Sequence, residues 1–239
     1  KLCGAACACT EAWRLLRYHR RAPYPIGSSK ANSSVMRLTT ALILGSGSST
    51  RKAILGEMGI PFTVDKPGID EKAIRREEPS ELVLALGLAK AAALLDGPNG
   101  ATYASRGDLI LTGDQVVVWN GQILEKPENE KEARAFIAGY GESPPSTVGS
   151  CVVTDAATRR QWHAVDVATV HFRPIPEDTV DRLLAEGECY HCAGGLMVEH
   201  PLVEPHIERM DGEIDSVMGL RKATVSDLLA KAEAARSQS

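Results

Sequence analysis

The sequence predicts an α/β protein with a mixed, twisted β-sheet and flanking helices. Strand-like and helix-like segments alternate in the first half of the chain, which is typical of parallel strands joined by helices. In the second half, two Val- and Thr-rich segments and a strong hairpin signal indicate antiparallel pairing. The 239 residues, 44% hydrophobic and 24% charged, are enough for one large domain or two small ones with a real core.

The first half begins with a short apolar strand, 42–44, which is followed by a small-residue loop and a helix over 51–58. A second strand is expected over 61–64, and a loop with adjacent carboxylates over 68–72. The Ala- and Leu-rich segment 81–95 predicts a long helix, with Ser80 as its N-cap. For 98–106 we expect a turn-rich, mobile excursion.

Segment 108–119 predicts two strands separated by a break at Gly113-Asp114. Asn120-Gly121 is the strongest short hairpin signal, and it predicts a return strand through 123–124. The rest of the chain predicts a helix over 130–140, two long strands over 147–154 and 161–172, and a helix over 176–184. A small-residue turn is expected over 192–196, a loop with a strand over 216–220, and a C-terminal helix over 223–236.

Residues 1–38 differ from the rest of the chain and are set apart from the folded domain, 39–236. They carry seven Lys or Arg residues against one acid, Glu11. This composition is typical of an organelle transit peptide, and a disordered or cloning-derived extension is the alternative. We therefore expect a cytoplasmic protein, or a plastid or mitochondrial one if the segment is a transit peptide.

The overall composition limits the possible partners. A net charge of −4 argues against a broad nucleic-acid-binding surface, and no apolar run approaches the roughly 20 residues that span a bilayer. The six cysteines lack a disulfide-framework spacing, so we expect mostly reduced thiols in an intracellular protein. Cys189 and Cys192 have the spacing of a zinc half-site, but a second pair could come only from the N-terminal cysteines.

The loop after the first strand is a candidate anion site. It contains Gly45 and Gly47, which allow close approach of another group, together with the hydroxyls of Ser46 and Ser48. A helix N-terminus exposes backbone N–H groups that favour anions. Arg51 and the neighbouring Lys52 are unfavourable there unless an anion lies between them. A phosphate group is the natural ligand, although such loops often bind nothing.

Asp114 is the most informative polar residue, because it interrupts an otherwise apolar stretch where burial is expected. A buried carboxylate needs a partner, a metal ion or a raised pKa; a turn-capping role after Gly113 is the alternative. Together with Glu71 it would hold a divalent cation or position water. Lysines at 90 and 126, with Arg51 and Lys52, would neutralise a polyphosphate, as phosphoryl transfer and pyrophosphate hydrolysis require.

In their order and spacing, these motifs resemble the Maf family of nucleoside triphosphate pyrophosphatases over residues 40–232. Each motif alone is weak, and the combination is specific. In chain order they are Leu44-Gly45-Ser46-Gly47-Ser48-Ser49-Thr50-Arg51-Lys52, Asp70-Glu71, Ala89-Lys90-Ala91, Gly113-Asp114-Gln115-Val116, Lys126-Pro127, Ala193-Gly194 and Val217-Met218-Gly219-Leu220.

The resemblance implies two lobes around a central cleft (a Maf/ITPase-like fold) and hydrolysis of a nucleoside triphosphate to the monophosphate and pyrophosphate. It also implies a divalent metal ion, Mg²⁺ or Mn²⁺, and a possible homodimer. Carried over to this sequence, the expected catalytic residues are Arg51, Lys90, Asp114 and Lys126, the substrate-binding residues are Ser46, Ser48, Lys52, Gln115 and Glu199, and the metal ligands are Glu71 and Asp114.

The family has two types that act on nucleotides with different nucleobases, and the residues near the base indicate which type this chain resembles. Asp114-Gln115 and Glu199 resemble the 7-methyl-GTP pyrophosphatase type, and a carboxylate suits the cationic 7-methylguanine ring. Thr50 departs from both variants, which carry Trp or Arg there, so a dTTP/UTP pyrophosphatase stays an alternative. Two hypotheses of a different class also stay open at this point. One is a nucleotide-binding regulator of cell division without turnover, and the second is an unrelated nucleotide-binding α/β domain.

Overall fold

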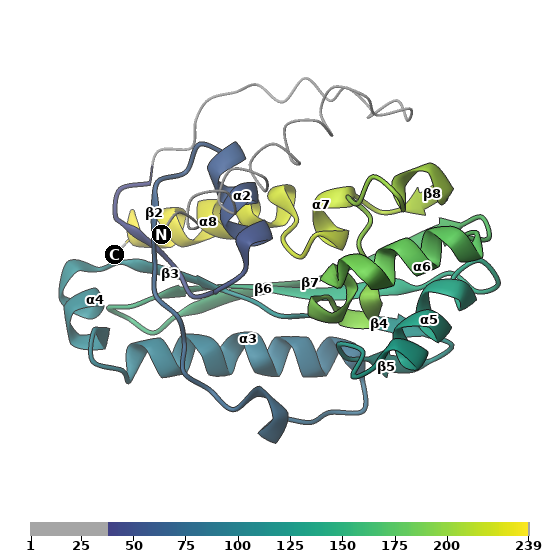
Figure 1. Cartoon of the computed structure of the whole chain (residues 1–239). Helices are drawn as coiled ribbons and strands as arrows, with labels where there is room; N and C mark the ends of the chain where they lie inside the picture. The colour runs from purple at the N-terminus through teal and green to yellow at the C-terminus, as the bar shows by residue number, and fades with distance from the viewer. Residues whose placement is uncertain (1–37, 239) are drawn as a thin grey trace, which may run out of the picture.

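The computed structural model describes residues 38–238 and confirms the predicted α/β class. The expected basic extension, apart from residue 38, lies outside the described residues. Within them, eight strands form one mixed sheet, with helices on both faces (Figure 1). The strands are β1 Leu42–Leu44, β2 Phe62–Val64, β3 Leu109–Thr112, β4 Gln115–Trp119, β5 Gln122–Leu124, β6 Ser146–Asp155, β7 Gln161–Phe172 and β8 Ile207–Asp211.

The sheet combines a parallel part with an antiparallel part. β1 pairs in parallel with β2 and β3, and the remaining pairs are antiparallel. β3 and β4 follow one another along one edge of β6, while β7 pairs with its other edge. The predicted break at Gly113-Asp114 separates β3 from β4. A side chain at Gly113 is impossible without movement, because an ideal Cβ there would lie 2.1 Å from the carbonyl oxygen of Ser150.

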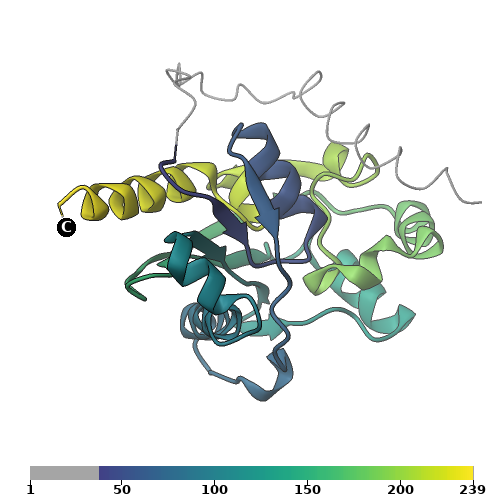
Figure 2. The same cartoon turned by 90° about the vertical axis from the view of Figure 1, so that its left-hand side faces the viewer.

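Helices cover the sheet on both sides. Figure 1 shows α3 along one face and α2 with α8 along the other, and Figure 2 shows the same arrangement with α3 viewed nearly end-on. The described helices are α2 Ser49–Glu57, α3 Pro79–Leu95, α4 Gly100–Arg106, α5 Glu130–Gly139, α6 Glu177–Glu186, α7 Ile214–Val217 and α8 Lys222–Arg236, with short 3₁₀ turns η1 Glu71–Ala73, η2 Glu188–His191, η3 Ala193–Gly195 and η4 Glu204–His206. None of these described helices is long and apolar enough to cross a membrane.

The alternation of side chains along β6 explains why both faces need a cover. Val148 packs in the cluster that contains Leu86 of α3, whereas Cys151 and Val153 pack in the cluster that contains Leu228 of α8. Because successive strand residues point to opposite faces, a strand that is buried at nearly every position must lie between two layers. β6 is such a strand, since all of its residues except Ser146 and Gly149 are buried, and it forms the centre of the first lobe.

A second lobe surrounds the far end of the sheet. Its core joins β4, β5 and β7 to α5 and α6. Tyr140 lies at its centre, stacked on Phe172 with 6.0 Å between ring centroids and edge-on to Trp119 at 5.9 Å. The predicted two-lobed arrangement is therefore present. The Asn120-Gly121 hairpin is also confirmed, since both residues have the positive φ that a type I′ turn requires.

The expectation of an irregular excursion over 98–106 was wrong. Residues Gly100–Arg106 form the helix α4, which ends at Gly107 in the left-handed conformation. Tyr103 explains the difference, because its ring is buried in the cluster that contains Ile43 and Ile110. A tertiary contact thus orders a segment whose local composition favours a turn.

Three further expectations need correction. The segment 216–220 contains no strand, because Ile214–Val217 forms the short helix α7. The edge strand β8 was missed, since most of its residues are exposed and give no alternating pattern. The long helix α3 begins at Pro79 with Glu78 as N-cap rather than Ser80, because Pro is well suited to the first helical position.

Candidate functional site

A cavity of about 1170 Å³ is lined by residues of both lobes. It lies against the carboxyl end of β1, the break between β3 and β4, and the end of β5. Its lining is strongly charged, with six cationic and six carboxylate side chains. The cations are Arg51, Lys66, Lys72, Arg75, Lys90 and Lys126, and the carboxylates are Glu71, Asp114, Glu125, Glu128, Glu188 and Glu199.

The predicted anion loop forms one wall of the cavity. Ser48 is the N-cap of α2, and its hydroxyl accepts a hydrogen bond from the backbone N–H of Arg51. The hydroxyl of Ser46 accepts one from the backbone N–H of Ser48 at 3.2 Å. The first turn of α2 contains no acidic residue, so the positive end of the helix dipole faces the cavity without a carboxylate of its own.

Arg51 is buried behind this loop, with 9% of its surface exposed. Its Nε donates to the carbonyl oxygen of Gly219 at 3.0 Å, and Nη1 donates to the carbonyl oxygen of Gly113 at 3.1 Å and to Ser46 Oγ at 3.3 Å. Burial lowers the pKa of the guanidinium, an effect that nearby Asp114 opposes. The residue therefore joins three chain segments and supplies a positive charge to the wall.

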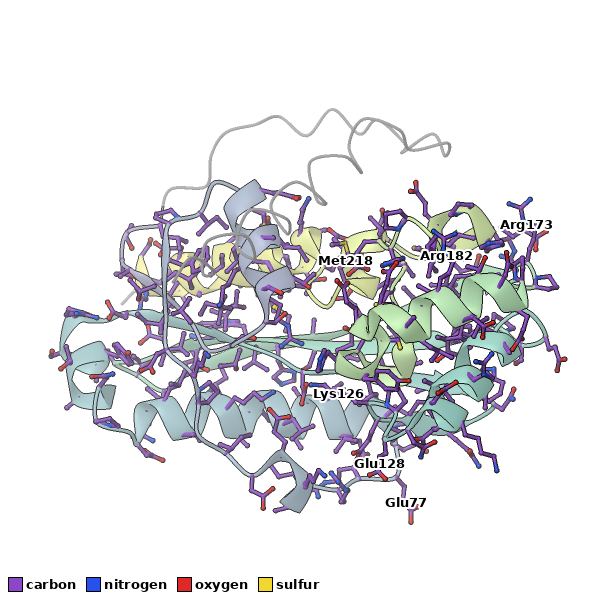
Figure 3. All side chains as sticks on the ribbon, in the orientation of Figure 1. Glu77, Lys126, Glu128, Arg173, Arg182 and Met218 are labelled. Atoms are coloured by element: carbon purple, nitrogen blue, oxygen red, sulfur yellow. The ribbon has the colours of Figure 1, made fainter. Side chains whose placement is uncertain are left out.

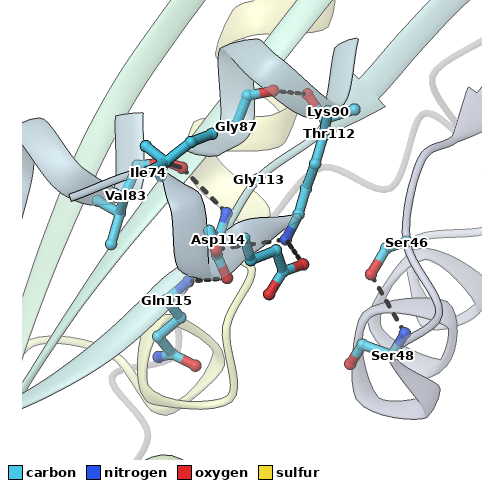
Figure 4. Close-up of polar contacts among 12 residues, drawn as sticks. Ser46, Ser48, Ile74, Val83, Gly87, Lys90, Thr112, Gly113, Asp114 and Gln115 are labelled. Carbon is cyan, nitrogen blue, oxygen red and sulfur yellow. Dashed lines mark hydrogen bonds and ion pairs between the residues drawn. The ribbon is translucent and has the colours of Figure 1, made fainter. Parts of the chain in front are cut away.

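Lys90 lies between two carboxylates (Figure 4). Its Nζ is 2.8 Å from Glu71 Oε1 and 3.3 Å from Asp114 Oδ2. The Lys90 side chain is 8% exposed, compared with 16% for Asp114 and 55% for Glu71. Lys90 comes from α3, Asp114 from the β3–β4 break and Glu71 from η1. The ion pairs thus bring together three elements that are far apart in the sequence.

Asp114 is held from its backbone as well as from its side chain. Its N–H donates to Ser150 Oγ at 3.0 Å, and the Ser150 hydroxyl donates to the carbonyl oxygen of Val83 at 2.6 Å. The second carboxylate oxygen, Oδ1, accepts a hydrogen bond from the backbone N–H of Gln115 at 2.9 Å. A fixed, mostly buried carboxylate with one edge toward a lysine is well placed to orient or deprotonate a water molecule.

Gln115 has a structural role that its sequence position did not suggest. Its side-chain amide nitrogen donates to the carbonyl oxygens of Ser216 at 3.0 Å and Val217 at 2.8 Å. Both amide hydrogens are thereby used to hold the α7 segment against β4. Although Gln115 lines the cavity as predicted, only its Oε1 can still serve a ligand.

The opposite wall of the cavity is formed by Lys126 and the segment 188–199. Figure 3 shows Lys126 in the middle of the molecule, between α3 and α6. The N–H of Gly194 donates to the carbonyl oxygen of Glu125 at 2.8 Å, which ties this segment to the end of β5. Burial and the charge of Glu199 raise the pKa of the Cys192 thiol to about 11, and the charge of Lys126 opposes this rise.

The cavity collects most of the residues that the sequence singled out. Ser46, Ser48, Arg51, Glu71, Lys90, Asp114, Gln115, Lys126 and Glu199 all line it. Lys52 does not: it is half-buried on α2, outside the lining. Sequence reasoning missed Lys66, Lys72, Arg75 and Glu188, which are surface-type residues in loops or short 3₁₀ turns and carry no recognisable motif.

The two candidate metal ligands fit a cation that arrives with its substrate. Glu71 and Asp114 converge on the same atom, Lys90 Nζ. Among residues 38–238, no group of three His, Cys, Asp or Glu side chains could hold a metal by itself. Mg²⁺ is commonly bound by one or two carboxylates plus phosphate oxygens and water, so a pair of carboxylates suits a metal–nucleotide complex. The N-terminal cysteines that a zinc site would need lie outside the described residues.

Comparison with known proteins decides the family. Residues 41–232 match the family described as Maf-like protein. This chain belongs to the Maf family. Over 80% of its length it is 38% identical to the 7-methyl-GTP pyrophosphatase of Dictyostelium discoideum, of which 96% is covered. It is also 33% identical over 79% of its length to the nucleoside triphosphate pyrophosphatase of Streptomyces coelicolor, with 89% covered. The dTTP/UTP pyrophosphatase of Pelotomaculum thermopropionicum is 29% identical over 80% of the chain, with 95% covered.

Proposed function

We propose that this Maf protein is a hydrolase that converts a nucleoside triphosphate to the monophosphate and pyrophosphate. The observation that carries the proposal is the convergence of Ser46, Arg51, Lys90, Asp114 and Lys126 on one cavity. The names of its relatives support the same activity. An unrelated nucleotide-binding fold would leave these residues apart.

In this reaction a water oxygen forms a bond to the α-phosphorus while the bond from that phosphorus to the bridging oxygen of the pyrophosphate breaks. Asp114 orients the water and accepts its proton, and the Lys90 ammonium holds the carboxylate in place at 3.3 Å. Arg51 and Lys126, on opposite walls, stabilise the negative charge that spreads over the phosphoryl oxygens.

A divalent cation, Mg²⁺ or Mn²⁺, would be held by Glu71 and Asp114 together with the phosphates. When bound, it would neutralise charge on the phosphoryl oxygens. The exposed Glu71, at the rim on a short 3₁₀ turn, is suited to meet a metal that enters with the nucleotide. The more buried Asp114 is suited to the proton transfer.

For the base we propose 7-methyl-GTP as the preferred substrate class. Glu199 lines the cavity together with Lys126 and Cys192, and a carboxylate attracts the cationic ring of 7-methylguanine. Relatives with that printed name include one that is 38% identical. No Trp, Tyr or Phe is among the described residues that line the cavity, so recognition would depend on polar contacts rather than on aromatic stacking.

The test is pyrophosphate release in the presence of Mg²⁺, measured with 7-methyl-GTP, GTP, dTTP, UTP and modified pyrimidine triphosphates. We expect the highest kcat/KM with 7-methyl-GTP and a loss of at least about 100-fold in the Asp114→Asn variant. A preference for dTTP and UTP would assign the chain to the other variant of the family. Nucleotide binding without turnover of any substrate would indicate a regulator and contradict the proposal, as would full activity of Asp114→Asn.

The oligomeric state and the compartment stay predictions. A homodimer follows only from the family resemblance, and light scattering of the purified chain tests it. A cytoplasmic location, or a plastid or mitochondrial one, depends on residues 1–38, which a fusion of that segment to a fluorescent protein would test.

A further inference from the structure

We infer that Lys66, which no sequence motif marks, binds the terminal phosphates of the substrate and the pyrophosphate product; this inference rests on the proposed function. Lys66 closely follows β2 and lines the cavity. β2 is parallel to β1, whose carboxyl end carries the anion loop. Ligands of α/β sheets bind beyond the carboxyl ends of parallel strands, so both loops reach the same place.

The Lys66 side chain lies against the anion loop. An ideal Cβ on Gly47 would lie 3.5 Å from Cε of Lys66, 3.8 Å from Cδ and 4.0 Å from Nζ. The aliphatic part therefore packs beside Gly47, and the ammonium lies next to the N-terminal end of α2. A cation beside a helix N-terminus is unfavourable by itself, and an anion bound between the two would remove the repulsion.

The charge of Lys66 is available for such an anion. Within residues 38–238, no carboxylate lies within ion-pair distance of its Nζ. The adjacent Asp65 is turned to other partners, because Tyr103 Oη donates to its Oδ2 at 2.6 Å and Asn99 Nδ2 at 3.1 Å. These hydrogen bonds, led by the one from Tyr103, lower the pKa of Asp65.

Three of the other cations that line the cavity differ from Lys66. Lys90 is paired with two carboxylates, and Arg75 is paired with Glu125 at 3.1 Å. Arg51 uses its N–H groups for three hydrogen bonds to the protein itself. Lys66 thus adds uncompensated positive charge over the anion loop, where the phosphates furthest from the base would lie.

The experiment compares the full chain with Lys66→Met, Lys66→Arg and the control Lys131→Met. Methionine keeps an unbranched apolar chain that can still pack on Gly47 but removes the charge, and Lys131 is an exposed lysine on α5 outside the cavity lining. Binding of inorganic pyrophosphate with Mg²⁺ is measured by calorimetry. Melting temperatures verify folding, and they should change little because Lys66 is exposed.

We expect Lys66→Met to weaken pyrophosphate binding roughly 10- to 100-fold, as for the loss of a charge-assisted hydrogen bond. Lys66→Arg should stay within about threefold of the unmodified chain, and Lys131→Met should equal it. KM for the best nucleotide should rise in parallel in Lys66→Met, because the contact is made before and during the reaction.

Binding of pyrophosphate by Lys66→Met within about twofold of the unmodified chain would overturn the inference. Equal losses in Lys66→Met and Lys66→Arg would overturn it too, since they would point to side-chain shape rather than charge. The result is separable from the proposed function. A chain that hydrolyses no nucleotide can still show the Lys66 dependence of pyrophosphate binding, and an active chain can lack it.

Discussion

Replacing Arg51 by methionine tests whether this residue holds the site together as well as binding phosphate. The guanidinium is buried and donates hydrogen bonds to the carbonyl oxygens of Gly219 and Gly113 and to Ser46 Oγ. Methionine fills much of the same space but donates nothing. The loop between α7 and α8, the β3–β4 break and the anion loop would each lose a link to α2.

The expected loss of stability comes from the carbonyl oxygens of Gly219 and Gly113, which would lose their hydrogen-bond donor. Leaving a buried acceptor without a donor costs about 1–3 kcal/mol, whereas the Ser46 hydroxyl can rotate to another partner. Removal of a buried charge returns part of its desolvation cost, so we expect a net decrease of about 2–4 kcal/mol in the free energy of unfolding. For a domain of this size that corresponds to a melting temperature lower by roughly 5–15 °C.

Thermal unfolding followed by circular dichroism, without nucleotide, measures this effect independently of catalysis. Lys52→Met is the matched control, because the neighbouring lysine on α2 is half-buried and does not line the cavity; its effect should stay within about 0.5 kcal/mol. If Arg51→Met melted within about 2 °C of the unmodified chain, Arg51 would not be the link between the three segments, and the reasoning would fail.

Three other outcomes follow from the structure. Gly113→Ala should destabilise by more than about 2 kcal/mol in urea unfolding, because the new methyl group would lie 2.1 Å from the Ser150 carbonyl oxygen; unchanged stability would contradict that close approach. Tyr103→Phe should cost about 0.5–1.5 kcal/mol at pH 7. Its hydrogen bond lowers the pKa of Asp65, so the difference is present above the usual carboxyl pKa and should shrink in melts toward about pH 3; a constant difference would refute this. Mg²⁺ alone should leave the melting temperature within about 1 °C, whereas Mg²⁺ with a non-hydrolysable nucleoside triphosphate should raise it. Strong stabilisation by the metal alone would contradict a site completed by phosphates.

The parts of the fold that the sequence predicted well are those set by local rules. Asn120-Gly121 specifies its hairpin because both residues adopt positive φ at low cost. The apolar run of β3 and β4 required a buried position, and the polar break inside it identified Asp114. Order and spacing of short motifs then identified the cavity lining, because several weak signals had to agree.

Other features depend on contacts between distant segments and could not be predicted. α4 forms because Tyr103 finds a buried position in the cluster with Ile43 of β1 and Ile110 of β3. The segment 216–220 looks like a strand in isolation, yet Gln115 and Arg51 bind its carbonyl oxygens and keep it out of the sheet. Lys66 has no local signal at all, since its significance comes from the register of β2 beside β1.

The ion pairs divide the lysines of the cavity into two groups: Lys90 is paired with carboxylates, and the others have no such partner among the described residues. Lys90 is enclosed by Glu71 and Asp114, so most of its charge is compensated and its main effect is to hold Asp114 in place. Lys66 and Lys126, like Lys72, have no carboxylate within ion-pair distance in the described part of the chain, and Lys66 and Lys126 lie on opposite walls. A polyphosphate between those walls would meet uncompensated charge from two sides. The sequence groups Lys90 and Lys126 together as phosphate-binding lysines, but their surroundings differ. We therefore expect Lys90 to position Asp114, and Lys126, together with Lys66, to attract the substrate.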